Sequence, residues 1–598
     1  MRKRSFLWVT YGVALILSTC SLLYELLIAQ TLATLAANTV VWYSVTIGLY
    51  LAAMGVGALL HRNSSPLGLW ERLFKIEILL TMAGSTAVIV MHFAHTASLT
   101  MDTTIVSASI FFGSALVMII LVGVLTGFEL PLLISLGNEA SPQRSVTNRV
   151  LGFDYFGALI AGVGFPLFLL PRFNLFTVGL LTASVNLVVA LVTLCWILPE
   201  KKQSVARIAI PGLLFFVLIA GLFKTEVVEQ YFLKKYYYYL SYPTKSAFLL
   251  DSMATRHDVL RVRSRYQQID LVSDTPSYKG DLLIDAYSTK FLENEKQPRN
   301  YGLFLNGDFQ LSGKYEEFYH EFFAHVPIAL NGRVPDRVLV LGGGDGLLIR
   351  EILKHDLVQK IVHVDLDNSL IELATTHPIL SAINEGALGD PRVHTQIGDA
   401  FYFIQNTTEQ FDAIFLDFPY ANDYNLSKLY SREFFHFVKK RLTPTGFAAL
   451  DAPGLRNQGR LFEIYLNTIV KAGFSDVRPY ISSVEVNNPR AREILSNSER
   501  WAGLSEVDKR REMIRFIARH VHSLRNGFIM MADVKRDENL YWDPGVKLHV
   551  LNEDRLHRTL RLAKLIRQTD LADSKKVNSI FRPTLPLGNV WNIRAAWD

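Results

Sequence analysis

Residues 337–355, RVLVLGGGDGLLIREILKH, decide the fold of the C-terminal half of the chain. Residues 338–341 are a short apolar run of the kind that forms a buried parallel strand. The glycines after it let the backbone turn sharply and approach a ligand, and residues 347–354 are typical of a helix. This order of strand, glycine-rich turn and helix predicts a nucleoside-binding unit of a Rossmann-like α/β fold.

Acidic residues accompany four predicted strands. Asp345 lies in the glycine turn, and Asp365 ends the strand KIVHVD about twenty residues later. Asp399 follows the run HTQIG, and Asp417 ends the run FDAIFLD. Because the carboxyl ends of parallel strands meet at one edge of a sheet, we expect the four carboxylates to converge there. The turn lacks the GxGxxG spacing of a dinucleotide fold, and an acid at Asp345 suits a ligand with positive charge rather than a pyrophosphate.

The first 223 residues differ in composition from the rest. Half of the 598 residues are hydrophobic and 19% are charged, and the apolar excess is concentrated in this first part. This composition disfavours a disordered, collagen-like or purely soluble protein. A membrane-spanning helix needs about 20 apolar residues. Stretches of that kind lie at 7–35, 40–60, 73–92, 105–136, 149–170 and 174–198, with a shorter one at 208–223. We expect a helical transmembrane bundle of about seven spans over 1–223.

Basic residues alternate between the loops of this bundle. The loops opposite the N-terminus carry only Arg172, whereas those on its own side carry Arg2, Lys3, Arg4, Arg62, Arg72, Lys75, Arg144, Arg149, Lys201, Lys202 and Arg207. The positive-inside rule therefore places the N-terminus in the cytoplasm, and the net charge of +6 reflects membrane topology rather than a nucleic-acid partner. Seven complete crossings would export the C-terminal half, unless 208–223 is re-entrant or interfacial. The two cysteines, Cys20 and Cys195, lie in apolar runs and predict neither a disulfide framework nor a metal site.

Several acids lie within or at the edges of these stretches, where an ionised carboxylate is costly. They are Glu25, Glu77, Glu129 and Asp154. They either hold helices together or mark a transport pathway, and both interpretations stay open. Lys75 and Arg149 are near enough in sequence to pair with Glu77 and Asp154.

The remaining chain divides into four segments. Residues 224–245 mix tyrosines with lysines, as expected of an interfacial linker, and 246–315 contain alternating runs that predict a small antiparallel β domain. Residues 316–540 form the predicted Rossmann-like domain, with an inserted charged segment at about 485–525. Residues 541–598 are a C-terminal extension with a basic amphipathic helix, which we expect to dock on the domain or on the bundle.

The C-terminal half resembles the polyamine aminopropyltransferase, or spermidine synthase, family. The resemblance covers about 264–480 and rests on the glycine-turn signature VLVLGGGDGLLIRE and on SRYQQI, LFLNGDFQLS, EEFYHEFFAHVPI, VDLD, GDAFYF, FDAIFLD and YSREFFHFVKKRLTPTGF. Multi-pass members of the family have an N-terminal bundle with segments similar to YELL, GFELPLL and DYFGAL, so the resemblance reaches both halves.

The resemblance implies transfer of an aminopropyl group from decarboxylated S-adenosylmethionine to a small amine, such as a putrescine-like diamine that becomes spermidine, with release of methylthioadenosine. This displacement needs orientation and a neutral amine, and no metal or prosthetic group. The implied donor contacts are Gln267, Gln310, Gly342, Gly344, Asp345, Asp365, Asp399 and Ala400. Asp417 is the implied general base, oriented by Tyr319, and the residues expected near the acceptor are His320, Tyr420 and Asp423.

Two departures from the family pattern leave alternatives open. The family usually has a second acid three residues after the base, whereas this chain has Tyr420 there, and Asp423 stands at a different position. The insertion at 485–525 interrupts a late substrate-facing loop. An S-adenosylmethionine-dependent methyltransferase, or a non-catalytic polyamine- or nucleoside-binding sensor or transporter, is therefore an alternative. For the enzyme, we expect a multi-pass protein of the inner cell membrane with its catalytic domain in the cytoplasm, where the donor is made, and the resemblance allows a homo-oligomer.

Overall fold

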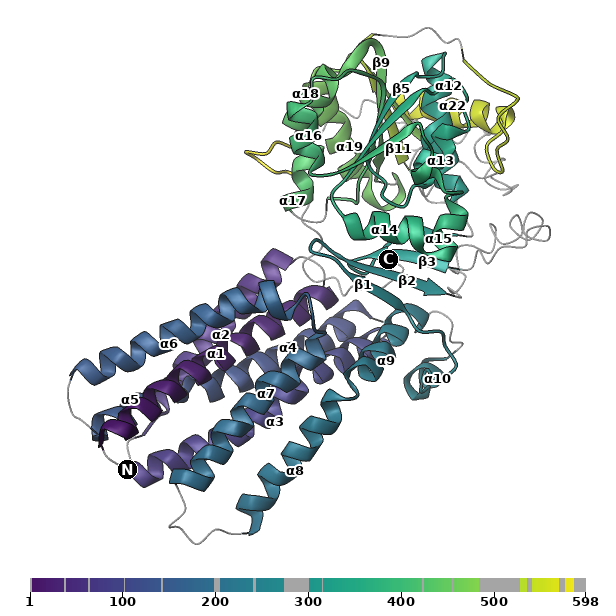
Figure 1. The fold of residues 1–598 in the computed structure, drawn as a ribbon. Coiled ribbons are helices and arrows are strands. Elements are labelled where there is room, and N and C mark those ends of the chain that lie inside the picture. The colour runs from purple at the N-terminus through teal and green to yellow at the C-terminus, as the bar shows by residue number, and fades with distance from the viewer. Residues whose placement is uncertain are drawn as a thin grey trace, which may run out of the picture.

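The computed structural model combines a helical bundle, a small β sheet and an α/β domain (Figure 1). It describes residues 3–36, 39–62, 65–101, 103–140, 144–197, 205–239, 244–273, 301–313, 316–421, 424–453, 455–482, 527–534, 540–568 and 576–585. The predicted insertion at 485–525 and Asp423 lie outside the described residues. The small sheet lies between the bundle and the α/β domain, and the N-terminus lies at the end of the bundle far from that domain.

The bundle is built from long apolar helices. They are α1 (Lys3–Ala36), α2 (Thr39–Leu59), α3 (Pro66–Ser98), α4 (Thr104–Gly127), α5 (Glu129–Ala140), α6 (Arg144–Gly164), α7 (Leu175–Val192) and α8 (Val205–Leu222). Short π-helical turns, η1 (Phe165–Leu169) and η2 (Thr193–Ile197), extend α6 and α7. Within the described ranges, six helical segments are long and apolar enough to cross a membrane, or seven if α8 and the helix after it form one span.

The predicted pairing of Lys75 with Glu77 is wrong. Lys75 Nζ lies 3.4 Å from Glu71 Oε1, and the buried Glu77 accepts a 2.7 Å hydrogen bond from Asn186 Nδ2 of α7. Residues two apart on a helix point in different directions, whereas residues four apart share a face. The buried acid therefore finds a partner on another helix.

The predicted pairing of Arg149 with Asp154 is also wrong. Neither side chain forms an ion pair with any residue that the structure describes. A separation of five residues again points the two side chains apart on α6. The α1 helix packs here instead, because Ser18 Oγ donates a 2.6 Å hydrogen bond to the Asp154 carbonyl and a Cβ on Gly157 would lie 2.3 Å from the Leu15 carbonyl oxygen. Small residues permit this close helix contact.

The predicted interfacial linker forms α9 (Thr225–Tyr238), which is bent by 63° from α8. A short helix, α10 (Lys245–Leu250), follows it. The small antiparallel sheet has the strand order β1 (Leu260–Arg263), β2 (Gln268–Ser273), β3 (Tyr301–Leu305) and β4 (Asp308–Ser312). Leu233 and Tyr237 of α9 pack against one part of this sheet, and Leu370 and Leu380 of the α/β domain pack against another. The small sheet thus joins the bundle to the α/β domain.

The α/β domain has a Rossmann-like sheet, as predicted. Its strand order is β10-β11-β9-β8-β5-β6-β7. Strands β5 to β9 are parallel, and β11 is antiparallel to both of its neighbours, β9 and β10. The strands are β5 (Arg337–Gly342), β6 (Lys360–Asp365), β7 (Val393–Ile397), β8 (Phe411–Asp417), β9 (Leu442–Ala452), β10 (Asp476–Ile481) and β11 (Gly527–Ala532).

Helices pack against both faces of this sheet, each over its own apolar core (Figure 1). They include α12 (Glu317–Asn331), α13 (Leu347–Leu353), α14 (Asn368–Thr376), α15 (Pro378–Ile383), α16 (Ala400–Asn406), α18 (Arg432–Lys440) and α19 (Leu455–Lys471). Shorter segments are η4 (Ala387–Gly389), α17 (Tyr424–Ser427) and η5 (Lys428–Tyr430).

The C-terminal extension docks on the α/β domain, one of the two places expected for it. The carboxylate of Glu321 in α12 accepts backbone hydrogen bonds of 2.6–2.8 Å from His549, Val550 and Leu551. The following helix, α22 (Glu553–Gln568), places Leu556 in the core beneath it.

Candidate active site

The glycine-rich turn after β5 brings the ends of three strands together. Gly342 has a φ of +82°, which favours glycine, and a Cβ there would lie 2.0 Å from the Asp417 carbonyl oxygen. The Gly343 N–H donates a 3.1 Å hydrogen bond to that same oxygen, at the end of β8. A Cβ on Gly344 would lie 2.9 Å from Asp365 Oδ2, at the end of β6. The glycines therefore let this turn lie against both carboxylates.

Asp417 has the surroundings of a general base. The Tyr319 hydroxyl donates a 2.8 Å hydrogen bond to Asp417 Oδ1, although the two residues are far apart in sequence. Burial, followed by the charge of Asp345, raises the pKa of Asp417 to about 6. A carboxylate with a raised pKa accepts a proton more readily, and it is still ionised at neutral pH.

The small sheet contacts the end of β6 through Gln267. Asp365 Oδ1 accepts a 2.8 Å hydrogen bond from the backbone N–H of Asp367, and burial raises the pKa of Asp365 to about 6. Gln267, in the turn between β1 and β2, donates from Nε2 to Asp367 Oδ2 at 2.9 Å. Gln267, which the sequence predicts to bind the donor, therefore contacts the α/β domain through Asp367.

The other predicted donor residues form local contacts of their own. Asp399 caps α16 by accepting from the Phe401 N–H at 2.7 Å and forms a 2.7 Å ion pair with Lys428. Ala400 is the first residue of that helix and is buried. Gln310 of β4 is half-buried, and its amide donates to the Asp308 carbonyl at 3.1 Å. In the described part of the chain, the Gln310 side chain forms no hydrogen bond with Asp345, Asp365, Asp399 or Asp417.

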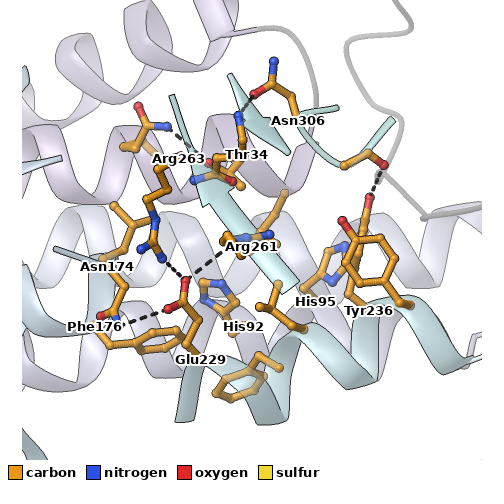
Figure 2. A pocket seen from close by; sticks show the side chains of 18 of the residues that line it. Thr34, His92, His95, Asn174, Phe176, Glu229, Tyr236, Arg261, Arg263 and Asn306 are labelled. Atoms are coloured by element: carbon orange, nitrogen blue, oxygen red, sulfur yellow. Dashed lines mark hydrogen bonds and ion pairs between the residues drawn. The ribbon is translucent and has the colours of Figure 1, made fainter. Parts of the chain in front are cut away.

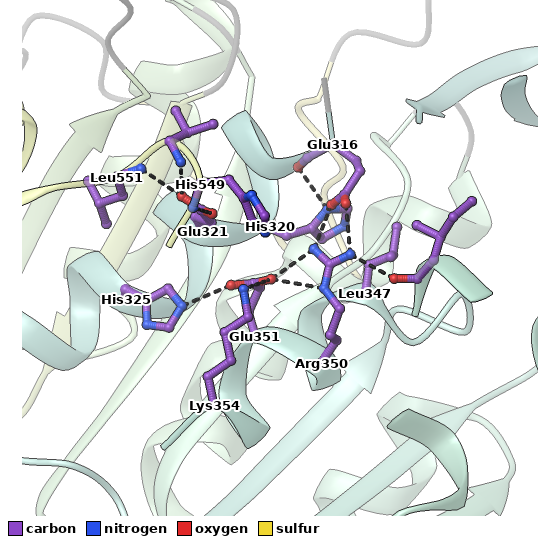
Figure 3. A network of polar contacts seen from close by, with 12 residues as sticks. Glu316, His320, Glu321, His325, Leu347, Arg350, Glu351, Lys354, His549 and Leu551 are labelled. Carbon is purple, nitrogen blue, oxygen red and sulfur yellow. Dashed lines mark hydrogen bonds and ion pairs between the residues drawn. The ribbon is translucent and has the colours of Figure 1, made fainter. Parts of the chain in front are cut away.

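A buried network of charges fixes α12, the helix that carries Tyr319 (Figure 3). Arg350 donates to both carboxylate oxygens of Glu316, at 2.7 and 2.9 Å, and also contacts Glu351 at 2.8 Å. His320 Nδ1 lies 3.0 Å from Glu316 Oε2. Burial alone would lower the pKa of His320, but the Glu316 carboxylate raises it above its usual value. The predicted acceptor-side histidine is thus held by the scaffold next to the site.

Comparisons with known proteins identify the family of this chain. A family model described as the spermine/spermidine synthase domain matches residues 316–488. A polyamine aminopropyltransferase of Leptospira interrogans is 31% identical over 438 residues, which are 73% of this chain and 77% of the relative. The chain belongs to this family. A second polyamine aminopropyltransferase, from Oceanobacillus iheyensis, is 33% identical over 450 residues, covering 74% of this chain and 77% of the relative.

Two solved structures are also similar. One is the spermidine synthase of Thermotoga maritima, and the other is a spermidine synthase in complex with the transition-state analogue AdoDATO. Each is 21% identical to this aminopropyltransferase and covers 52% of it and 87% of the solved chain, with TM-scores of 0.37 and 0.38.

One acid of this aminopropyltransferase site was not predicted from the sequence. Asp451 is the second-last residue of β9, the strand beside β8, where Leu450 pairs with Leu416 and so places Asp451 next to Asp417. Its side chain is buried, and Oδ1 has no hydrogen-bond partner among the described residues. Burial and the Asp417 charge raise its pKa well above the usual value. The run GFAALDAPG carried the same signal as the other four acids, because it too ends an apolar strand on an aspartate.

The predicted acceptor residue Tyr420 lies near both acids. Burial, followed by the charges of Asp451 and Asp417, raises the pKa of its hydroxyl well above the usual value. The structure thus brings Tyr319, His320, Tyr420, Asp345 and Asp417 of this aminopropyltransferase to one region, with Asp365 beside them.

Proposed function

We propose that this chain transfers an aminopropyl group from decarboxylated S-adenosylmethionine to a small amine and releases methylthioadenosine. The observation that carries the proposal is the hydrogen bond from Tyr319 to Asp417, next to Asp345 in the glycine turn. Family membership supports the same reaction. The donor carries positive charge at its sulfonium and at its aminopropyl ammonium, and clustered buried carboxylates attract that charge.

The reaction is a direct displacement. The neutral amine nitrogen attacks the aminopropyl carbon bonded to sulfur, a C–N bond forms, and the C–S bond breaks with its electron pair moving to sulfur. The product sulfur is a neutral thioether. Asp417 accepts the proton that the amine must lose, and Tyr319 holds the carboxylate in place. Asp345 binds the donor ammonium, and Asp365 accepts hydrogen bonds from its ribose.

We propose a diamine as the acceptor, with Asp451 contacting its second nitrogen. The chain lacks the usual second acid after Asp417, and the buried Asp451 supplies beside that base a carboxylate oxygen, Oδ1, that has no hydrogen-bond partner in the described part of the chain. In Asp451→Asn, we expect kcat/KM for 1,4-diaminobutane to fall by about tenfold or more, because a charge-assisted hydrogen bond is lost. The value for n-butylamine, which has no second nitrogen, should change little. An equal loss for both amines would refute this role of Asp451.

The base assignment has its own test. In Asp417→Asn, we expect kcat to fall by about 10²–10⁴ while methylthioadenosine still binds, because only the proton acceptor is removed. Isothermal titration measures binding and mass spectrometry measures turnover. Turnover equal to that of the unmodified enzyme would contradict the base role of Asp417.

We propose that the bundle lies in the inner cell membrane, with the lipid bilayer as its partner. The apolar helical segments support this, as do exposed apolar side chains such as Leu213 and Phe216 on α8. The loop charges support a cytoplasmic N-terminal end. Homo-oligomerisation, suggested by the family resemblance, is measured by light scattering of the detergent-solubilised protein.

We propose a cytoplasmic α/β domain, because the donor is made there. One observation argues against it: α8 runs along the bundle, and the α/β domain lies at the end opposite the N-terminus (Figure 1). If the bundle spans a membrane in this arrangement, the domain and the N-terminus lie on opposite sides. Protease added to intact cells decides between the two, since cleavage of the domain from outside contradicts the cytoplasmic assignment and protection in intact but not lysed cells supports it.

A further inference from the structure

A cavity lined by both polar and apolar side chains lies where the helical bundle meets the small sheet (Figure 2). This junction cavity is lined by residues of α1, α3, α7, α9 and the small sheet, among them Gln30, His92, Asn174, Glu229, Arg263 and Gln268. Its volume is about 80 Å³. One water molecule needs about 10–15 Å³ on this measure, so the cavity admits a polyatomic group. None of its lining residues belongs to the aminopropyl-transfer site.

The charges around the cavity disfavour a cationic ligand. Glu229 of α9 is engaged on both oxygens: Oε2 accepts from Asn174 at 3.1 Å, and Oε1 contacts Arg261 at 3.5 Å and also Arg263 (Figure 2). Arg261 in turn donates to both oxygens of the buried Asp270, at 2.7 and 2.6 Å. A cation in the cavity would have to compete with these partners for the Glu229 carboxylate, and the guanidinium groups of Arg261 and Arg263 would repel it.

The cavity has unused hydrogen-bond donors instead. A guanidinium carries five N–H groups, and Glu229 is the only described residue with which the Arg263 side chain makes a polar contact. The side-chain amide of Gln268, opposite Arg263 in the β1–β2 pair, makes no hydrogen bond to any described residue. These groups can donate to an anion, and the planar guanidinium matches the oxygen geometry of a phosphate.

One wall of the cavity is aromatic. The rings of Phe176 and Phe232 stack with centroids 5.6 Å apart, and the His92 ring lies 4.8 and 5.2 Å from them. This wall suits an apolar group attached to the anion. The cavity also lies at the end of the apolar helices, near the 63° bend between α8 and α9, where the headgroups of a surrounding bilayer would lie.

We propose that the junction cavity binds a phosphate ester with an attached apolar group, through the guanidinium of Arg263 and the amide of Gln268. The phosphate comes either from a lipid headgroup or from a soluble phosphate monoester. The shared chemistry is an anion that accepts from Arg263 while its apolar part lies against Phe176 and Phe232.

The same hairpin connects this cavity to the donor site. Arg263 ends β1, Gln268 begins β2, and the turn between them carries Gln267, which donates to Asp367 at 2.9 Å. A ligand that joins Arg263 and Gln268 to the bundle wall restricts the hairpin and so the position of Gln267. Occupancy therefore tightens donor binding, and donor binding tightens the phosphate ester by the same factor. This coupling rests on the proposed donor site, whereas binding in the cavity does not.

Phenyl phosphate and phosphatidylglycerol nanodiscs are the two probes. In the full-length protein in detergent, isothermal titration measures phenyl phosphate binding with and without methylthioadenosine. In nanodiscs, the donor KM is compared between phosphatidylglycerol and phosphatidylcholine. The variants are Arg263→Gln and Gln268→Leu. Arg265→Gln is the matched control, because Arg265 is an exposed arginine of the same hairpin that does not line the cavity.

We expect a probe to bind and to lower the donor KM about threefold or more in the unmodified protein and in Arg265→Gln. Arg263→Gln should weaken binding by about tenfold or more, because a charge-assisted contact is lost. A response to phenyl phosphate alone identifies a soluble ligand, and one to phosphatidylglycerol alone identifies a lipid. The proposal is wrong if neither probe has an effect, or if spermidine binds the cavity instead. It is also wrong if Arg263→Gln and Gln268→Leu both keep the melting temperature of the unmodified protein and still bind the probes as tightly as the control does. Binding without a change in donor KM would refute the coupling only.

Discussion

Replacing Tyr319 by phenylalanine tests the contribution of its hydroxyl to the proposed base. The change keeps the ring that packs against Phe323 and Phe528 and removes the hydroxyl that donates to Asp417 at 2.8 Å. A hydrogen bond to a charged group contributes about 1.5–3 kcal/mol, and one pKa unit corresponds to about 1.4 kcal/mol. Without the Tyr319 hydroxyl, the ionised form of Asp417 is less stable, so the pKa of Asp417 should rise from about 6 by roughly one to two units.

The pH dependence of turnover measures this shift. Because the base must be ionised to accept a proton, kcat should fall as the pH decreases through the pKa of Asp417. In Tyr319→Phe, that decrease should begin at a pH roughly one to two units higher. Tyr301→Phe is the matched control, because its buried hydroxyl has no hydrogen-bond partner among the described residues. An acidic limb that stays in place in Tyr319→Phe would refute the coupling between the two side chains.

Three further substitutions test the scaffold. Gly344→Ala should weaken methylthioadenosine binding in titration, because the added Cβ would lie 2.9 Å from Asp365 Oδ2. Arg350→Met should lower the melting temperature, because removing the guanidinium that pairs with the buried Glu316 and Glu351 carboxylates costs about 3–5 kcal/mol. Glu321→Gln should make the C-terminal extension more sensitive to limited proteolysis, because an amide oxygen replaces a carboxylate that accepts three backbone hydrogen bonds.

Matched controls accompany these variants. Gly389→Ala adds a Cβ in open space and should leave methylthioadenosine binding unchanged. Arg432→Met removes an exposed partner of Glu433, where an ion pair is worth only about 0–1 kcal/mol. Equal losses in a variant and its control would contradict the proposed contacts, and so would an extension in Glu321→Gln that resists protease as before.

The sequence predicts those parts of the fold and site that follow from strand ends. Each of Asp345, Asp365, Asp399 and Asp417 lies at or after the end of a predicted strand, and parallel strands bring such positions to one edge. Asp451 lies close to the end of β9 in the same way, but it stands outside the motifs that carry the family resemblance. Residues 337–417 therefore carry most of the predictable information.

Contacts between distant segments are the part that the sequence does not reveal. Local proximity suggested Lys75 as the partner of Glu77, whereas helix geometry turns the two apart and gives Glu77 the amide of Asn186 from another helix. The contacts of Glu229 with Arg261 and Arg263 arise only because α9 bends from α8 and lies against the small sheet. No pattern in the sequence predicts that α8, α9 and the small sheet come together in this way.

The identity of the thio-product tests the central claim most directly. The purified full-length protein is incubated with 1,4-diaminobutane and either decarboxylated S-adenosylmethionine or S-adenosylmethionine, and all products are identified by mass spectrometry. The account predicts methylthioadenosine and an aminopropylated diamine in equal amounts with the decarboxylated donor, and no product with the other. Formation of S-adenosylhomocysteine and a methylated product would contradict it, as would the absence of turnover with both donors across a series of amines.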